Sequence, residues 1–146
     1  MKPYYFFLAF LFFLACNPDF HKVDEQLVDN ERKEKAREYA LELIKSFEAG
    51  KFDKIDRYGT EYMKEMMTPA RQDSIYELIN AEYGKFVSME YVSAWAEEKK
   101  GLTAFRFRGE FEKTDNRPEI RIMLSSEDSL DGFWIRPWKE SLGKWR

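Results

Sequence analysis

The spacing of apolar residues changes once along the chain, and this change limits the fold more than any other feature of the sequence. Between residues 30 and 83, apolar side chains recur every three or four positions, which is the period of amphipathic helices. Beyond Phe86 they recur at every second position, which is typical of strands with one buried face. This order predicts an α+β fold in which N-terminal helices pack on one face of a curved antiparallel sheet of about four strands.

Four helices are predicted, and glycine or proline marks their boundaries. The first begins at Asn30 and ends before Gly50, and two short helices follow on either side of Gly59. A fourth opens at Thr68–Pro69, a capping residue followed by proline in the first turn, and it ends at Gly84. The side chains expected to face the core are Ala36, Tyr39, Ala40, Leu43, Ile44, Phe47, Ile55, Ile75, Leu78 and Ile79.

Two predicted turns set the register of the strands. With a tight turn at Lys100–Gly101, alternate residues of the strand 90–96 face the same side as the phenylalanines of the next strand. A second turn at Asp115–Asn116 keeps that side apolar through the strand 120–124. This side is therefore the predicted core of the sheet, and its central members are Phe105, Phe107, Ile122 and Ile135.

The opposite side of the predicted sheet carries aromatic and basic residues. It includes three tryptophans, and arginine beside tryptophan is typical of interface hot spots. We therefore expect this side to bind a protein or a small molecule, or a second copy of the chain in a homodimer. The alternative is that Trp95 stacks on Arg106, that Glu110 neutralises Arg121 and that the C-terminal tail through Trp145 folds over the rest, so that these residues stabilise the monomer. The residues of this side are Tyr91, Trp95, Arg106, Arg108, Arg121, Trp134, Arg136 and Trp138.

Residues 1–15 have the pattern of a signal peptide. Lys2 precedes an uncharged apolar run of about twelve residues from Tyr4 to Ala15, whereas a membrane-spanning helix needs about 20. Cys16, the only cysteine of the chain, stands where this run ends. The segment 16–29 has no sustained period, and it is predicted to be a tether before a domain over residues 30–146.

The sequence Leu14-Ala15-Cys16 resembles the lipobox of bacterial lipoproteins, in which the cysteine is acylated and begins the mature chain. It departs from that pattern at Phe13, where leucine is usual, and at Leu14, where a smaller residue is usual. The resemblance implies that the protein is anchored to a membrane of the bacterial cell envelope, outside the cytoplasm. A secretory leader with an incidental cysteine and an uncleaved anchor are the alternatives.

The order of elements, with "FEAGKFDKI" closing the first helix and "DGFWIRPW" entering the last strand, resembles small bacterial nuclear-transport-factor-2-like (cystatin-like) domains. It is most similar to a family of uncharacterised secreted and lipid-anchored members. The resemblance implies a curved sheet wrapped on a long helix, often with a conical cavity between them. It implies no single function.

Some relatives of that fold are enzymes that use a carboxylate and a tyrosine inside the cavity. The predicted register places Glu90 opposite Phe111 on the core side, so Glu90 with Tyr62 is the candidate pair for such chemistry. The alternative is that Glu90 reaches solvent or pairs with an arginine. No cofactor is predicted, because one cysteine and one histidine are too few for a usual zinc or iron site.

Charge makes nucleic acid an unfavourable partner, because the formal net charge is −3. The leading prediction is a non-catalytic ligand-binding or protein-binding domain on a lipid anchor. The alternatives are a cavity enzyme of isomerase or hydrolase type and a structural lipoprotein of the envelope.

Overall fold

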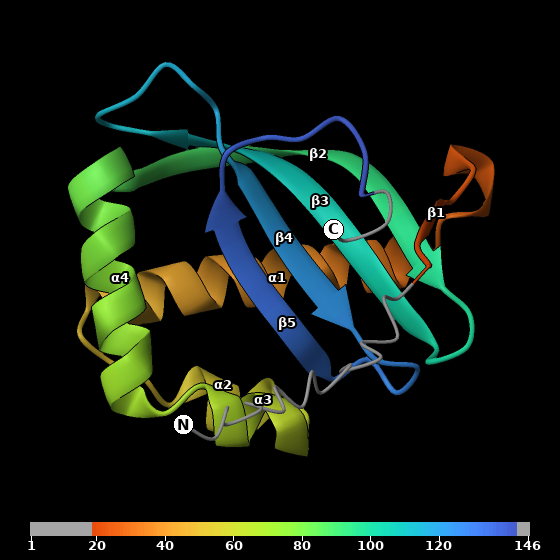
Figure 1. Cartoon of the computed structure of the whole chain (residues 1–146), viewed down its shortest axis with the longest axis horizontal. Coiled ribbons are helices and arrows are strands. Elements are labelled where there is room, and N and C mark those ends of the chain that lie inside the picture. The colour runs from red at the N-terminus through yellow and green to blue at the C-terminus, as the bar shows by residue number, and fades with distance from the viewer. Residues whose placement is uncertain (1–18, 143–146) are drawn as a thin grey trace, which may run out of the picture.

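A computed structural model describes residues 19–142, so the predicted signal peptide and Cys16 lie outside the described residues. Figure 1 shows the order of the elements, which run from strand β1 near the N-terminus to strand β5 near the C-terminus. Their bounds are β1 His21–Lys22, η1 (a 3₁₀ helix) Glu25–Leu27, α1 Asn30–Glu48, α2 Lys54–Tyr58, α3 Glu61–Met66, α4 Pro69–Tyr83, β2 Phe86–Glu97, β3 Leu102–Phe111, β4 Glu119–Leu124 and β5 Leu130–Arg136.

The strands form one antiparallel sheet in the order β1-β2-β3-β4-β5. In Figure 1 the long helix α1 crosses one face of this curved sheet, and α4 stands at one end of it. We call the face that carries α1 the inner face and the other the outer face. The predicted α+β architecture, with helices on one sheet face, is confirmed.

The helix boundaries follow from the capping residues that the sequence supplies. The Asp29 side chain accepts hydrogen bonds from the first turn of α1, and Thr68 Oγ1 accepts one from Arg71 N at 3.4 Å at the start of α4. Gly84 ends α4 with a positive φ of 78°, a conformation that favours glycine.

One helix face differs from the prediction. Leu78 is 70% exposed, whereas Gln72 is buried, because α4 packs on the core through Tyr76 and Ile79. The buried Gln72 amide remains hydrogen-bonded, since its Nε2 donates to the carbonyl oxygen of Met67 at 2.6 Å. The expectation that Leu78 faces inward is therefore wrong.

The core lies between α1 and the inner face of the sheet. Phe105, Phe107 and Ile122 are at most 1% exposed, and they pack with Phe47 and other side chains of α1. Ile135 is partly buried and packs against the same cluster. The predicted core residues of the sheet are thus found together.

The register of β2 on β3 differs from the prediction in two ways. The turn is longer than expected, since Glu97 pairs with Leu102, and it encloses four residues, 98–101. A bulge at Val92 then changes which residues share a face, because an extra residue on one strand reverses the alternation beyond it. Tyr91 therefore lies opposite Phe107 on the inner face, and Glu90 lies opposite Arg108 on the outer face.

The register of β3 on β4 differs too, because the loop between them is longer than a two-residue turn. Phe107 pairs with Ile120, whereas the predicted register placed it opposite Leu124. This shift is of four residues, an even number, so the apolar side of β4 still faces the core.

Part of the segment expected as a tether is structured. Strand β1 pairs with the end of β2, and Val23 N donates to Ala94 O at 2.9 Å. Phe20 is 8% exposed and packs with Ala104 and Leu142 on the outer face. The described fold therefore begins about ten residues before position 30.

Candidate functional site

The space between α1, α4 and the sheet is filled by side chains. A hollow of only about 10 Å³ remains there, and the aromatic rings of Phe47, Tyr76, Phe86 and Phe111 line it. The ring centres of Phe47 and Tyr76 lie 6.4 Å apart. Phe86 packs edge-on against Phe111, with 5.7 Å between the ring centres. Since small-molecule sites usually hold about 300 Å³ or more, this hollow offers no room for a substrate.

The two candidate catalytic residues do not meet. Glu90 lies on the outer face with its side chain 71% exposed, and its Oε2 is 3.4 Å from Arg117 Nη2. Tyr62 lies on α3 and is 59% exposed. The prediction that Glu90 points into the core is wrong because of the bulge at Val92. The alternative, in which Glu90 pairs with an arginine, agrees with the structure.

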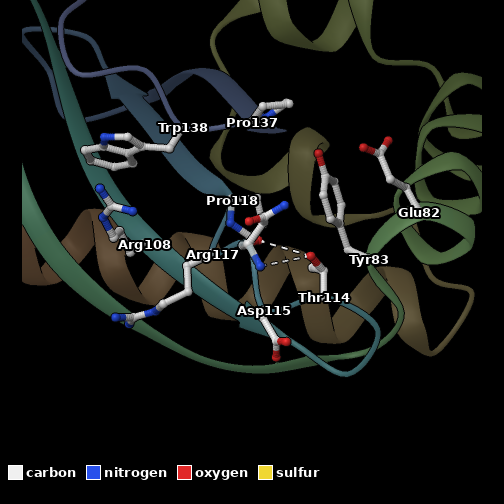
Figure 2. Close-up of a pocket in the computed structure, with 10 residues that line it drawn as sticks. Glu82, Tyr83, Arg108, Thr114, Asp115, Arg117, Pro118, Pro137 and Trp138 are labelled. Atoms are coloured by element: carbon white, nitrogen blue, oxygen red, sulfur yellow. Dashed lines mark hydrogen bonds between the residues drawn. The ribbon is translucent and has the colours of Figure 1, made fainter.

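A second hollow is an open groove of about 510 Å³. It lies between the end of α4, the loop that joins β3 to β4, and the segment that follows β5. Figure 2 shows Trp138 and Arg108 together on one side of this groove and Tyr83 and Glu82 on the other. Residues of the loop between β3 and β4 lie between the two sides. We call this hollow the α4 groove, and its lining is Glu82, Tyr83, Arg108, Thr114, Asp115, Asn116, Arg117, Pro118, Pro137 and Trp138.

Hydrogen bonds hold the β3–β4 loop against the end of α4. Lys113 N donates to Tyr83 O at 2.9 Å, Glu112 N donates to Lys85 O at 3.0 Å, and Lys113 Nζ donates to Asn80 O at 3.0 Å. A Cβ at Gly84 would lie 2.8 Å from Lys113 Cγ, so the close approach of this loop also requires glycine there. These contacts hold the loop against the end of α4 along one wall of the groove.

Tyr83 contributes a neutral aromatic surface to that wall. Its ring lies 5.7 Å from the ring of Phe111. Burial, followed by a hydrogen bond to Glu82, raises the pKa of Tyr83 to about 12. The hydroxyl is therefore protonated at neutral pH, where it can donate a hydrogen bond but cannot act as a base.

Trp138 forms the opposite wall and stacks on two arginines. Its ring centre lies 4.1 Å from the guanidinium carbon of Arg108 and 4.3 Å from that of Arg106. Its indole Nε1 donates to Glu140 Oε1 at 3.1 Å, and Arg108 Nη2 lies 3.9 Å from the same oxygen. The exposed carboxylate of Glu140 thus lies beside the indole N–H of Trp138 and the guanidinium of Arg108.

The segment after β5 covers part of the outer face of the sheet (Figure 1). Arg106 donates to the backbone carbonyl oxygens of Lys139 and Glu140, and Leu142 is buried against Phe20 and Ala104. We call residues 137–142 the C-terminal strap. The expected stacking of Trp95 on Arg106 is present, with 5.9 Å between the ring centre and the guanidinium carbon. The expected partner of Arg121 was wrong, because Arg121 Nε donates to Glu119, whereas Glu110 accepts from Ser88.

Beneath the strap, Glu119 lies between two buried arginines. Glu119 Oε1 accepts from Arg106 Nε at 2.9 Å and from Arg121 Nε at 2.6 Å, and all three side chains are at most 1% exposed. Burial raises the pKa of the Glu119 carboxyl, but hydrogen bonds from Arg106 and Arg121 outweigh that effect and hold it below its ordinary value. Glu119 is therefore charged throughout the neutral range.

The residues of the predicted binding face do not form one continuous exposed surface. Arg106 and Arg121 are inside the protein, and Tyr91 is on the inner face with its ring 5.8 Å from that of Phe107. Arg108 and Trp138 line the α4 groove. The remaining members, Trp95, Trp134 and Arg136, are partly exposed.

Four residues that matter here were not singled out from the sequence. Glu119 had a usable signal, since it precedes Arg121 by two positions and must share its face within one strand. Tyr83, Arg117 and Glu140 lie at element ends or in loops, where strand alternation predicts nothing.

Two further properties concern only residues 19–142. In that part of the chain, no three His, Cys, Asp or Glu side chains cluster in a way that could hold a metal ion. No helix there has both the length and the apolar character needed to cross a membrane.

A family described as "Protein of unknown function (DUF3887)" matches residues 40–133, which is more than half of the chain. The chain belongs to this family. The DUF3887 match runs from within α1 into β5, so it includes the filled core, the Glu119 cluster and the β3–β4 loop. The C-terminal strap, with Trp138 and Glu140, follows the matched DUF3887 region. Searches of curated proteins and of solved structures each gave no match.

Proposed function

We propose that this DUF3887 protein is lipid-anchored at the bacterial cell envelope and that its folded domain binds a ligand or a protein partner without catalysing a reaction. The observation that carries the binding role is the α4 groove, an open hollow of about 510 Å³, whereas the hollow between α1, α4 and the sheet holds only about 10 Å³. Its size lies within the range of sites that hold small molecules or a few residues of a peptide.

The chemistry of the groove favours binding over catalysis. Arg108 and Arg117 each lie within 4 Å of a carboxylate, and guanidinium groups bind carboxylates with matched geometry. The Tyr83 hydroxyl, with a pKa of about 12, is poorly suited to remove a proton at neutral pH. Aromatic rings and arginines are also the residue types that contribute most to binding energy at interfaces.

The proposed anchor rests on the leader and on Cys16. An acylated Cys16 would stand four positions before Phe20, which is packed on the sheet. Four residues span at most about 14 Å when extended, so the domain would lie close to the membrane surface. We also propose a relationship to nuclear-transport-factor-2-like domains, which the five-stranded sheet on one long helix supports.

Photocrosslinking in intact cells tests the binding role. A photoreactive benzoylphenylalanine at Asp115, an exposed residue of the groove, should capture a molecule of defined mass. The same group at Ser74, an exposed residue of α4 outside the groove lining, is the matched control and should not. Equal products from both positions, or none from Asp115, would contradict a binding role for the groove.

A further inference from the structure

We infer that the α4 groove recognises an acidic segment of a partner protein, and that one carboxylate of this segment takes the place of Glu140 beside Arg108 and Trp138. This inference depends on the binding role proposed above and adds the chemistry of the ligand. It comes from two exposed carboxylates of the same chain, Glu140 and Glu90, which lie next to the two arginines that line the groove.

Glu140 shows where a ligand carboxylate would bind. Its Oε1 accepts from Trp138 Nε1 at 3.1 Å and lies 3.9 Å from Arg108 Nη2. The Glu140 side chain is 90% exposed, so only these contacts at its end hold it in place. Exposed ion pairs of this kind contribute little to stability, so an incoming carboxylate can replace Glu140 without disturbing the fold.

A second arginine repeats this arrangement. Both terminal nitrogens of Arg117 lie 3.4 Å from Glu90 Oε2, and the two side chains are 39% and 71% exposed. The groove thus offers two arginines, each already next to an exposed carboxylate of the same chain. Guanidinium groups bind carboxylates with matched geometry, so a ligand with two carboxylates fits both positions.

The acidic residues of the groove favour a peptide over a polyanion. Glu82 lies on the wall opposite Trp138 and Asp115 lies in the loop between the walls, and both would repel the continuous negative charge of a nucleic acid or an anionic membrane surface. Tyr83, Pro118 and Trp138 provide apolar surface on which a peptide side chain can pack. A short segment with a few acidic residues and an apolar one meets all of these surfaces.

A peptide titration of the full chain in neutral detergent tests this inference. The probe is a pool of capped pentapeptides, each with one phenylalanine and two glutamates in varied spacing, and the matched pool has glutamine at the same positions. The readout is the ¹⁵N indole resonance of Trp138, assigned by its loss in Trp138→Phe. We expect the glutamate pool to shift this resonance with an affinity at least tenfold above that of the glutamine pool.

Three variants locate the effect. Arg108→Gln should weaken binding of the glutamate pool at least tenfold, because it removes a charged hydrogen-bond donor. Glu140→Gln should strengthen it about 1.5- to 5-fold, because an exposed competing carboxylate is removed. Glu127→Gln, which removes an exposed carboxylate between β4 and β5, should leave the affinity unchanged. Unchanged melting temperatures would show that the variants remain folded.

Several results would overturn the inference. They are equal affinity for the two pools, weaker binding in Glu140→Gln, and no shift at all up to about 10 mM peptide. Binding of phosphatidylglycerol vesicles that requires Arg108, without binding of the peptides, would also overturn it in favour of a lipid ligand. If Asp115 crosslinks a molecule in cells but the glutamate pool does not bind, only the ligand chemistry is wrong.

Discussion

Arg106 on β3 and Glu119 on β4 form an ion pair inside the protein, with Nε and Oε1 2.9 Å apart and with side-chain exposures of 1% and 0%. Arg121 donates to the same oxygen at 2.6 Å. Because Arg106 also donates to backbone carbonyls of the C-terminal strap, the cluster connects the centre of the sheet to the segment that covers it. The outer face is therefore a second packed layer, in which this buried charge cluster accompanies the apolar contacts of Phe20, Ala104 and Leu142.

Replacing the central carboxylate should destabilise this layer strongly. Glu119→Gln keeps the shape of the side chain but leaves Arg106 and Arg121 buried without its charge, which should lower the free energy of unfolding by about 3 to 5 kcal/mol. Urea denaturation followed by circular dichroism measures the loss. Glu127→Gln, an exposed control, should change it by less than about 0.5 kcal/mol. A similar small effect in both variants would show that the cluster contributes little.

The turn between β4 and β5 is clamped to α1 by Asp128. Its carboxylate accepts from Arg32 Nε at 2.5 Å and from Lys35 Nζ at 3.2 Å, and its φ of 60° is one that asparagine also tolerates. Asp128→Asn should therefore retain the turn but lose about 1 to 3 kcal/mol through the weaker hydrogen bonds.

The effect of Asp128 should depend on pH. Burial raises its pKa, but the hydrogen bonds from Arg32 and Lys35 outweigh this and place the pKa below the ordinary value of 3.8. A depressed carboxyl pKa stabilises the fold above the unfolded value, and this stability is lost as the pH falls through the folded value. The difference between wild type and Asp128→Asn should be constant at pH 5 to 7 and shrink below about pH 4. A difference that persists unchanged at pH 2 would contradict the charge-based explanation.

Phe107 is expected to be among the most costly core residues to truncate. It is fully buried, and Tyr91 packs on it from β2 while the guanidinium carbon of Arg37 lies 5.4 Å from its ring centre. Phe107→Ala should destabilise the domain by about 3 to 5 kcal/mol, measured as a shift of the thermal melting midpoint. Val87→Ala, at a position 56% exposed on β2, is the control and should shift it little. An unchanged midpoint in Phe107→Ala would contradict the observed packing.

Lipidation of Cys16 is tested by substitution. Cys16→Ser removes the sulfur that would carry the acyl chains, and it should release the protein from membranes into the soluble fraction. Fractionation of cells and incorporation of labelled fatty acid measure the two consequences. A Ser variant that stays on membranes, or a wild type that takes up no label, would contradict the anchor.

The sequence predicted the features that depend on local periods and caps. Helix boundaries at Thr68 and Gly84 were correct because a capping hydroxyl and a positive-φ glycine act within one turn of chain. The core side of β3 and β4 was correct even with the wrong register, because the error was an even number of residues. These periods alone predicted that the helices come first in the chain and the antiparallel sheet comes after them.

Only the tertiary structure decided the features that depend on distant segments. The bulge at Val92 inserts one residue, and this moves Glu90 outward and Tyr91 inward, which no local pattern indicates. The strap lies over Arg106, which is buried against a carboxylate on another strand, so part of a face composed like an interface is covered by its own chain. The α4 groove forms where the end of α4, β3 with the loop after it, and the C-terminal strap come together. Strand alternation does not predict which distant segments lie next to each other. The physical reason is that periodicity reports which way a side chain points, whereas long-range packing decides what it meets.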